Sequence, residues 1–192
     1  MRAATLLALV LAAGCLAAQP PAEPRYFAPR APPAGDTEPA RAADGPLLRL
    51  RRVRAASYLR DRMVWRRGVE MGFHDLLRWT ESPARFAESW LEDELFERRG
   101  FRRAESPAAV TLDASLDAFD ELLAPTHEAE VALDIVLSDP KQGTLLDRTI
   151  EVRRPIASDD PSAVADALGA ALAEAAAQVG AAVSEALGTR SP

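Results

Sequence analysis

The chain has 192 residues, of which 29 are acidic and 23 basic, so its formal net charge is −6. An acidic balance argues against general nucleic-acid binding, which needs a net basic surface. The single cysteine excludes an intramolecular disulfide. Nearly half of the residues are hydrophobic, and a chain of this length can bury a sizeable core in one domain.

The first fourteen residues have the layout of an export signal. Arg2 is followed by an uncharged, apolar stretch over residues 3–13. As a helix this stretch is too short to cross about 30 Å of hydrocarbon. Residues 1–14 therefore predict a cleaved signal peptide rather than a membrane-spanning anchor. Export leads to an oxidising compartment, where a lone free thiol is unusual.

Residues 11–15 read Leu-Ala-Ala-Gly-Cys and resemble the lipobox of bacterial lipoproteins. The resemblance implies that Cys15 is acylated and becomes the new N-terminus, which anchors the chain durably to a membrane. The alternative is an ordinary signal-peptidase cut, because Ala12 and Gly14 also satisfy its small-x-small rule. Leu16 is not the Asp that commonly retains lipoproteins in the inner membrane. We therefore expect a lipid-anchored protein of the outer membrane that faces the periplasm, rather than one of the inner membrane or the soluble periplasm.

A segment rich in proline and alanine follows the cysteine. Eight prolines lie between Gln19 and Pro46. Such a sequence cannot bury enough apolar surface to form a core, so residues 15–45 predict a lipidated N-terminus and an extended tether. The aromatic pair Tyr26-Phe27 interrupts the segment and indicates a short edge strand that docks on the domain. Residues 46–188 predict that domain, and residues 189–192 a short tail.

The first half of the domain combines strands with one helix. Residues 47–54 predict a strand with a bulge, because Val53 falls out of the alternation of apolar residues. After a turn that begins at residues 58–59, residues 63–65 and 70–77 predict two strands of a hairpin joined at Arg67-Gly68. Ser82-Pro83 supplies a capping hydroxyl and a proline at the first helical position. The helix that starts there ends at Gly100.

In the second half, apolar residues alternate with polar ones. They predict strands over residues 110–118, 129–137 and 145–152, each with one buried face, as in antiparallel sheets. Residues 139–143 form a turn, and Asp160-Pro161 starts a last helix whose apolar stripe reaches Leu187. These elements predict an α+β fold with an antiparallel-rich mixed sheet of about five to six strands and two long helices packed on one face.

The order and spacing of several short patterns add a family resemblance. The patterns are Leu48-x-Leu50-x-x-Val53, Tyr58-Leu59, Met63-Val64-Trp65-Arg66, and Trp79-x-x-x-Pro83 leading into a helix. Behind a lipidated cysteine, this order resembles the ABC-type transport auxiliary lipoprotein family, and the resemblance covers nearly the whole chain after Cys15. It implies a non-catalytic lipoprotein that serves a paraquat-inducible or mammalian-cell-entry-type intermembrane lipid transport system. The implied partners are a periplasmic mammalian-cell-entry-domain protein, a permease and an ATPase, with a homo-oligomer also possible.

The patterns of catalytic and metal-binding residues are missing from the sequence. Neither His74 nor His127 has a further ligand at a metal-site spacing, and His127 is expected to be solvated. His74 and Asp75 would point to opposite faces of a strand. There is no Gly-x-Ser-x-Gly, phosphate-binding glycine loop or dinucleotide fingerprint. We therefore expect no enzyme activity, cofactor or metal. The alternatives are a periplasmic enzyme whose groups converge from distant positions and a structural, Tol-like assembly lipoprotein.

Arginines crowd one segment of this acidic chain, and only Asp61 opposes them within that segment. Such a surface can meet acidic protein or lipid phosphate, or it can protect an edge strand against aggregation; the sequence leaves both open. Trp79 can anchor an interface or pack over the first turn of the following helix, which we favour. The candidate partner-binding residues are Arg49, Arg51, Arg52, Arg54 and Trp79, and the arginine run continues through Arg60, Arg62, Arg66 and Arg67.

Overall fold

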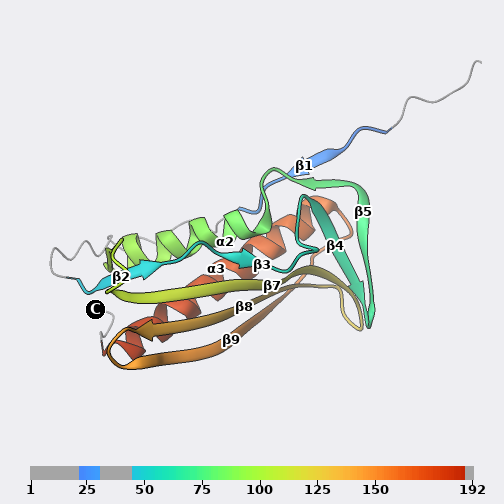
Figure 1. The fold of residues 1–192 in the computed structure, drawn as a ribbon. Coiled ribbons are helices and arrows are strands. Elements are labelled where there is room, and N and C mark those ends of the chain that lie inside the picture. Colours follow the sequence, from blue (N-terminus) through green and yellow to red (C-terminus); the bar gives the residue numbers. More distant parts are fainter. Residues whose placement is uncertain (1–21, 31–44, 189–192) are drawn as a thin grey trace, which may run out of the picture.

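The computed structural model describes residues 22–30 and 45–188, so the expected signal peptide, the expected lipidation at Cys15 and the tail lie outside the described residues. The described part holds a nine-stranded mixed sheet, two α-helices and a π-helical segment (Figure 1). The elements are β1 Arg25–Phe27, β2 Leu47–Leu50, β3 Arg54–Ala55, β4 Arg62–Arg67, β5 Glu70–Trp79, α2 Pro83–Glu92, η2 Asp93–Arg98, β6 Arg102–Arg103, β7 Val110–Ala124, β8 Glu128–Asp139, β9 Gly143–Pro155 and α3 Pro161–Ala186.

The longest strand, β7, organises the sheet. Along one edge it pairs in turn with β2, β3 and β4, all parallel to it. Along its other edge it pairs with β8, and β9 follows; both pairings are antiparallel. β5 continues the sheet antiparallel to β4, β1 lies parallel to β5, and β6 lies parallel to β2. These three strands share one edge of β7: β2 lies beside its start and β4 beside its end.

The α+β class is confirmed, but the sheet has more strands than the five to six that the sequence predicts. The strands that the sequence does not predict are short: β3 and β6 have two residues each. Alternation over two or three residues carries no periodic signal, so such strands escape a sequence pattern. The sheet also contains more parallel pairing than expected, since the crossover through α2 brings β7 back alongside β2, β3 and β4.

The core lies between the sheet and the helices. Alternate residues of β7 and β8, such as Leu112 and Ile135, are fully buried, as are Leu168, Leu172 and Val179 of α3. α3 contacts β8 and β9, while α2 contacts α3 and β7 (Figure 1). α3 is long and apolar enough to cross a membrane, but 67% of its most apolar stretch is buried inside the domain. Its alanines and leucines therefore serve the core.

The N-terminal segment is part of the fold. β1 pairs with the last residues of β5, and Pro29 is buried. The backbone of Arg30 crosses α3 at Gly169, where a Cβ atom would lie 2.6 Å from the carbonyl oxygen of Arg30. The predicted edge strand at Tyr26-Phe27 thus exists, and residues 25–30 of the expected tether belong to the domain. This docking leaves nine residues, or ten Cα-to-Cα steps, between Cys15 and Arg25.

We expect Gly169→Ala to undock residues 25–30 from α3. Alanine favours the helix by about 1 kcal/mol, but its methyl group needs the space that the Arg30 backbone occupies. Hydrogen–deuterium exchange of the peptide over residues 25–30 should therefore become faster while the domain keeps its stability. Gly180→Ala, on the same helix but facing the Glu94 side chain, is the control and should leave that peptide unchanged. Unchanged exchange in Gly169→Ala would contradict the predicted docking.

Candidate functional site

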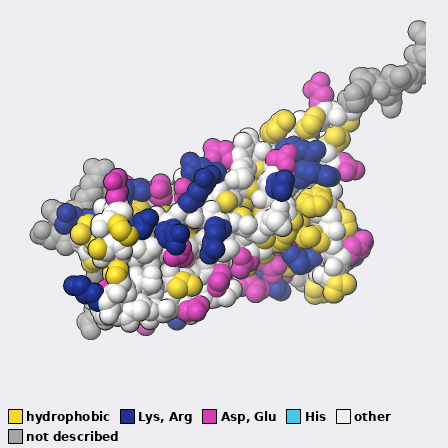
Figure 2. All heavy atoms as spheres, viewed as in Figure 1, with side chains coloured by type: hydrophobic (Ala, Val, Ile, Leu, Met, Phe, Trp, Pro, Cys, Tyr) yellow, Lys and Arg dark blue, Asp and Glu magenta, His cyan; other side chains and the backbone are white. Residues whose placement is uncertain are grey.

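The arginine-rich segment forms one flank of the domain. Residues 51–53 break the predicted strand into β2 and β3, which turns Val53 into the core at 4% exposure. The Val53 amide there donates a hydrogen bond to the Glu88 carboxylate of α2 at 3.2 Å. The flanking side chains of Arg51, Arg52 and Arg54 remain exposed. Basic side chains accordingly gather over β2 and β3 in Figure 2.

Most of these guanidinium groups are available to a partner. Arg51 pairs with Asp113 of β7 at 3.2 Å, whereas Arg49, Arg52 and Arg54 form no ion pair with any residue that the structure describes. A surface hollow of about 320 Å³ lies among Arg51, Arg52, Val53, Arg54 and Asp113. Guanidinium groups bind carboxylates and phosphates through paired hydrogen bonds. This arginine flank, defined as Arg49, Arg51, Arg52 and Arg54, is therefore the strongest candidate surface for an acidic partner.

Trp79 does not belong to that surface. Its side chain is 3% exposed and lies edge-on to Phe86 in the first turn of α2 and to Phe119 of β7, with ring centroids 6.1 and 5.2 Å apart. This geometry is the packing alternative that the sequence favours. The structure therefore removes Trp79 from the candidate partner-binding residues, because a buried indole cannot touch a docking protein.

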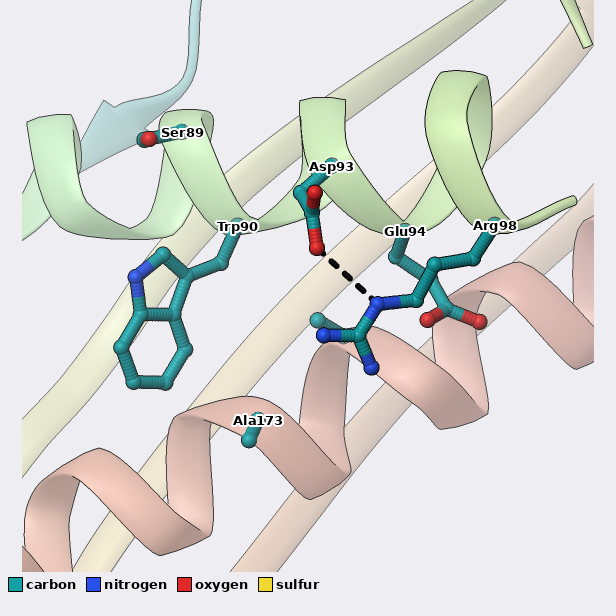
Figure 3. A pocket seen from close by; sticks show the side chains of 7 residues that line it. Ser89, Trp90, Asp93, Glu94, Arg98 and Ala173 are labelled. Atoms are coloured by element: carbon teal, nitrogen blue, oxygen red, sulfur yellow. Dashed lines mark hydrogen bonds and ion pairs between the residues drawn. The ribbon is translucent and has the colours of Figure 1, made fainter. Parts of the chain in front are cut away.

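A second hollow, of about 310 Å³, lies between α3 and the continuous helical segment of α2 and η2 (Figure 3). The sequence predicts one helix up to Gly100, but the structure changes to a π-helix at Asp93. A π-helix joins residues five apart, and the two ion pairs here have that spacing: Arg98 with Asp93 at 2.9 Å and Arg99 with Glu94 at 2.8 Å. The hollow is lined by Ser89, Trp90, Asp93, Glu94, Arg98, Ala173 and Ala176.

This helical hollow has fewer binding groups to offer than the arginine flank. Its volume is at the lower end of small-molecule pockets. Figure 3 shows the Asp93–Arg98 pair inside it, so these charges already neutralise each other. Glu94 is 6% exposed and lies against Gly180 of α3, where a Cβ atom would come within 2.7 Å of its carboxylate oxygen. The π-helix thus serves to seat a buried ion pair on α3.

Both histidines meet one buried carboxylate, which the sequence does not reveal. Glu121 is 5% exposed, and its two oxygens lie 2.6 Å from His74 Nε2 and 2.6 Å from His127 Nε2. The expectation of a solvated His127 is therefore wrong; its Nδ1 also lies 3.5 Å from Asp159. Burial raises the pKa of Glu121, but the hydrogen bonds and charges of the two histidines outweigh burial and hold this pKa below its usual range.

The histidine cluster, defined as His74, Glu121 and His127, is a structural network in this geometry. In residues 22–30 and 45–188, no group of three or more His, Cys, Asp or Glu side chains is arranged to hold a metal ion. The cluster joins β5, β7 and the start of β8, three strands whose relative register no local pattern encodes. The sequence carries no signal for it, because Glu121 lies beyond the predicted strand of residues 110–118 and His127 precedes the predicted strand of residues 129–137.

A second buried network explains two residues of the family pattern. Asp120 is fully buried, and its Oδ2 accepts hydrogen bonds from Arg66 Nη2 at 2.6 Å and Nε at 3.1 Å. The Tyr58 hydroxyl donates to the Asp117 carbonyl at 2.8 Å. Burial, with the nearby Asp120 charge, raises the pKa of Tyr58 to about 12. Tyr58 and Arg66 thus tie β4 and its preceding turn to β7.

The structure defines a two-helix, mixed-sheet α+β domain with a basic flank on an acidic chain. The chain belongs to the family of ABC-type transport auxiliary lipoprotein components, whose model matches residues 29–180. Membership places the chain among envelope proteins that are anchored to a membrane by a lipid and associated with a transport system.

Solved structures share the fold. Protein XCC0632 from Xanthomonas campestris, assigned to the DUF330 family, matches with a TM-score of 0.67 at 20% identity, over 81% of this chain and 92% of that one. An uncharacterised protein matches with a TM-score of 0.64 at 14% identity, over 84% and 99% of the two chains. A hypothetical protein from Chlamydia trachomatis reaches 0.50 at 8% identity, over 72% and 95%. No curated protein matches the chain.

Proposed function

We propose that this protein is a non-catalytic outer-membrane lipoprotein that docks on the periplasmic mammalian-cell-entry-domain subunit of an ABC-type intermembrane lipid transport system. The observation that carries the docking is the arginine flank, which leaves three guanidinium groups without ion-pair partners among the described residues. In a chain of net charge −6 this is a local reversal of sign, suited to an acidic rim on the partner.

The anchor and the tether set where docking takes place. Acylation of Cys15 would hold the domain at a membrane, and ten Cα-to-Cα steps of extended chain reach at most about 36 Å from Cys15 to Arg25. A domain on so short a tether stays close to the membrane that holds its lipid. Its partner must therefore project across the periplasm toward it, which supports a conduit subunit held by a permease and an ATPase in the opposite membrane.

The buried polar groups support a role without catalysis. Asp120, Glu94 and Glu121 are each held by arginine or histidine partners inside the fold. Each of these networks joins two or more elements, as expected for groups that determine architecture. This arrangement favours an interaction protein over the alternative of an enzyme whose residues converge from distant positions.

The docking proposal is tested by reversing charge on the flank. We expect Arg52→Glu together with Arg54→Glu to lower co-purification of the mammalian-cell-entry-domain partner by about tenfold or more, since like charges replace attraction across the interface. Both side chains are exposed and have no ion-pair partner in residues 22–30 and 45–188, so the fold should tolerate the change. Arg148→Glu, an exposed arginine of β9, is the matched control and should leave co-purification intact.

Equal recovery of the partner with wild-type and doubly reversed protein would contradict docking through this flank. The arginines would then be left with the alternative role of protecting an edge strand, since β3 pairs with β7 alone.

A further inference from the structure

The hairpin of β4 and β5 exposes apolar side chains that contribute nothing to the core. Val69 is fully exposed, and Met71, Phe73 and Leu76 are 41%, 38% and 38% exposed. Val69 follows Gly68, whose φ of 61° suits the first position of a tight hairpin turn. Turn positions of this kind usually carry Asn, Asp or Gly. Folding therefore gives no reason for a valine at the tip.

The outer edge of β5 is also open. β1 covers only Leu77–Trp79 of this strand, so residues 70–76 have no strand partner on that side among the described residues. Open edges with apolar side chains are usually blunted or covered, because they attract other molecules. Hydrophobic side chains gather over this end of the domain in Figure 2, apart from the basic side chains over β2 and β3.

The described N-terminal strand β1 lies at the same end of the domain as the hairpin tip (Figure 1). β5 starts at the tip, bends, and ends beside β1, which runs parallel to its last three residues (Figure 1). Val69 precedes Leu77, the partner of Arg25, by eight residues of strand, or about 26 Å. Cys15 lies at most about 36 Å from Arg25. An acyl group on Cys15 can therefore bring the tip down to the bilayer.

The side chains around the tip suit the boundary between headgroups and acyl chains. The guanidinium of Arg62 lies 5.1 Å over the Phe73 ring, and Arg67 at the turn has no ion-pair partner among the described residues. Aromatic side chains and arginines are the residues that proteins place at this depth of a membrane.

We propose that the hairpin end, defined as Val69, Met71 and Phe73, is a second membrane contact that inserts into the bilayer holding the Cys15 lipid. The inference rests on the lipid anchor of the proposed function. A contact of this size binds weakly alone, but the anchor supplies a high effective concentration. The contact then orients the domain: β4 pairs with the end of β7 and β2 with its start, so the arginine flank extends away from the membrane.

The test measures the depth of the tip in the acylated, full-length mature protein. Because Cys15 carries the lipid, Val69→Cys provides a single free thiol for an environment-sensitive fluorophore. In vesicles of phosphatidylethanolamine and phosphatidylglycerol, we expect a blue-shifted emission and several-fold stronger quenching by lipids that are spin-labelled near the headgroup. Gln142→Cys is the matched control, since it lies in the exposed turn of β8 and β9 at the other end of β7. Adding Met71→Asp should abolish the quenching at position 69.

Equal quenching at positions 69 and 142 would overturn the proposal. A blue shift at position 69 that rises with protein density, without quenching by lipid, would also overturn it and assign the hairpin end to a second copy of the chain. Flotation of the labelled protein with the vesicles reports the anchor separately. Protein that floats without quenching at position 69 refutes only the membrane contact, whereas loss of flotation refutes the anchor as well. Partner docking is measured independently by co-purification.

Discussion

Replacing Arg66 with methionine is expected to lower the free energy of unfolding by about 3–5 kcal/mol, as for other buried ion pairs that lose one partner. Arg66 makes two hydrogen bonds to Asp120, whose side chain is fully buried. Without the guanidinium, this carboxylate stays in the interior with the Tyr58 hydroxyl at 3.3 Å and the Phe119 amide at 3.4 Å as its remaining hydrogen-bond donors. Urea unfolding at pH 7, followed by far-ultraviolet circular dichroism, measures the loss.

Two comparisons make this prediction specific. Arg51→Met removes an ion pair with Asp113 that is 58% and 28% exposed, so it should cost less than about 1 kcal/mol. The double variant Arg66→Met/Asp120→Leu removes both charges and should recover much of the lost stability, because a buried pair can often be replaced by apolar side chains. A double variant no more stable than Arg66→Met would show that the uncompensated carboxylate is not the cause.

Replacing Glu121 with glutamine is expected to cost about 1.5–3 kcal/mol at neutral pH, the range for hydrogen bonds to charged groups. The carboxylate accepts hydrogen bonds from His74 and His127 at 2.6 Å each. An amide accepts through one oxygen only, so one histidine must change tautomer to accept from the amide nitrogen, and both lose a hydrogen bond to a charged acceptor. The measurement is urea unfolding of both proteins between pH 3 and 7.

The pH dependence of the free energy of unfolding on the acid side gives the sign of the Glu121 contribution. The pKa of Glu121 lies below its usual value of 4.5 in the folded protein. This carboxylate therefore stabilises the fold above pH 4.5, and its contribution is lost as the pH falls through the folded pKa. The difference between wild type and Glu121→Gln should shrink below pH 4.5. Glu151→Gln, an exposed position of β9, should show no such change. A constant difference across the range would refute a stabilising charge at Glu121.

The arginine flank could be predicted from the sequence because its signal is local. Arg49 to Arg54 follow one another in a short segment, and the chain offers only Asp61 nearby to oppose the arginine run. The packing of Trp79 on the first turn of α2 follows from the four positions that separate it from Pro83. The break at Val53 could be expected for the same reason, since one apolar residue out of phase marks the irregularity within a single strand.

The two buried networks could not be predicted, because their members are far apart in the chain. Arg66 and Asp120 are 54 positions apart, and His74 and Glu121 are 47 apart. Their contacts require the parallel pairing of β4 with the end of β7, which no local pattern encodes. The same holds for the open edge of β5, since its exposure depends on how few residues of β1 pair with it.

The sequence alone specifies most elements and the charge distribution of this protein: where apolar residues alternate in strands, where capped helices begin, and where positive charge is concentrated. These properties depend on neighbours a few residues apart, within the period of one helix or strand. Only the tertiary structure decided which short strand joins which part of β7, that residues 25–30 dock on β5 and α3, and that both histidines share Glu121. Those outcomes depend on strand register and on backbone packing between distant segments. A shift of one residue in the register of a strand would turn each of its side chains to the other face of the sheet.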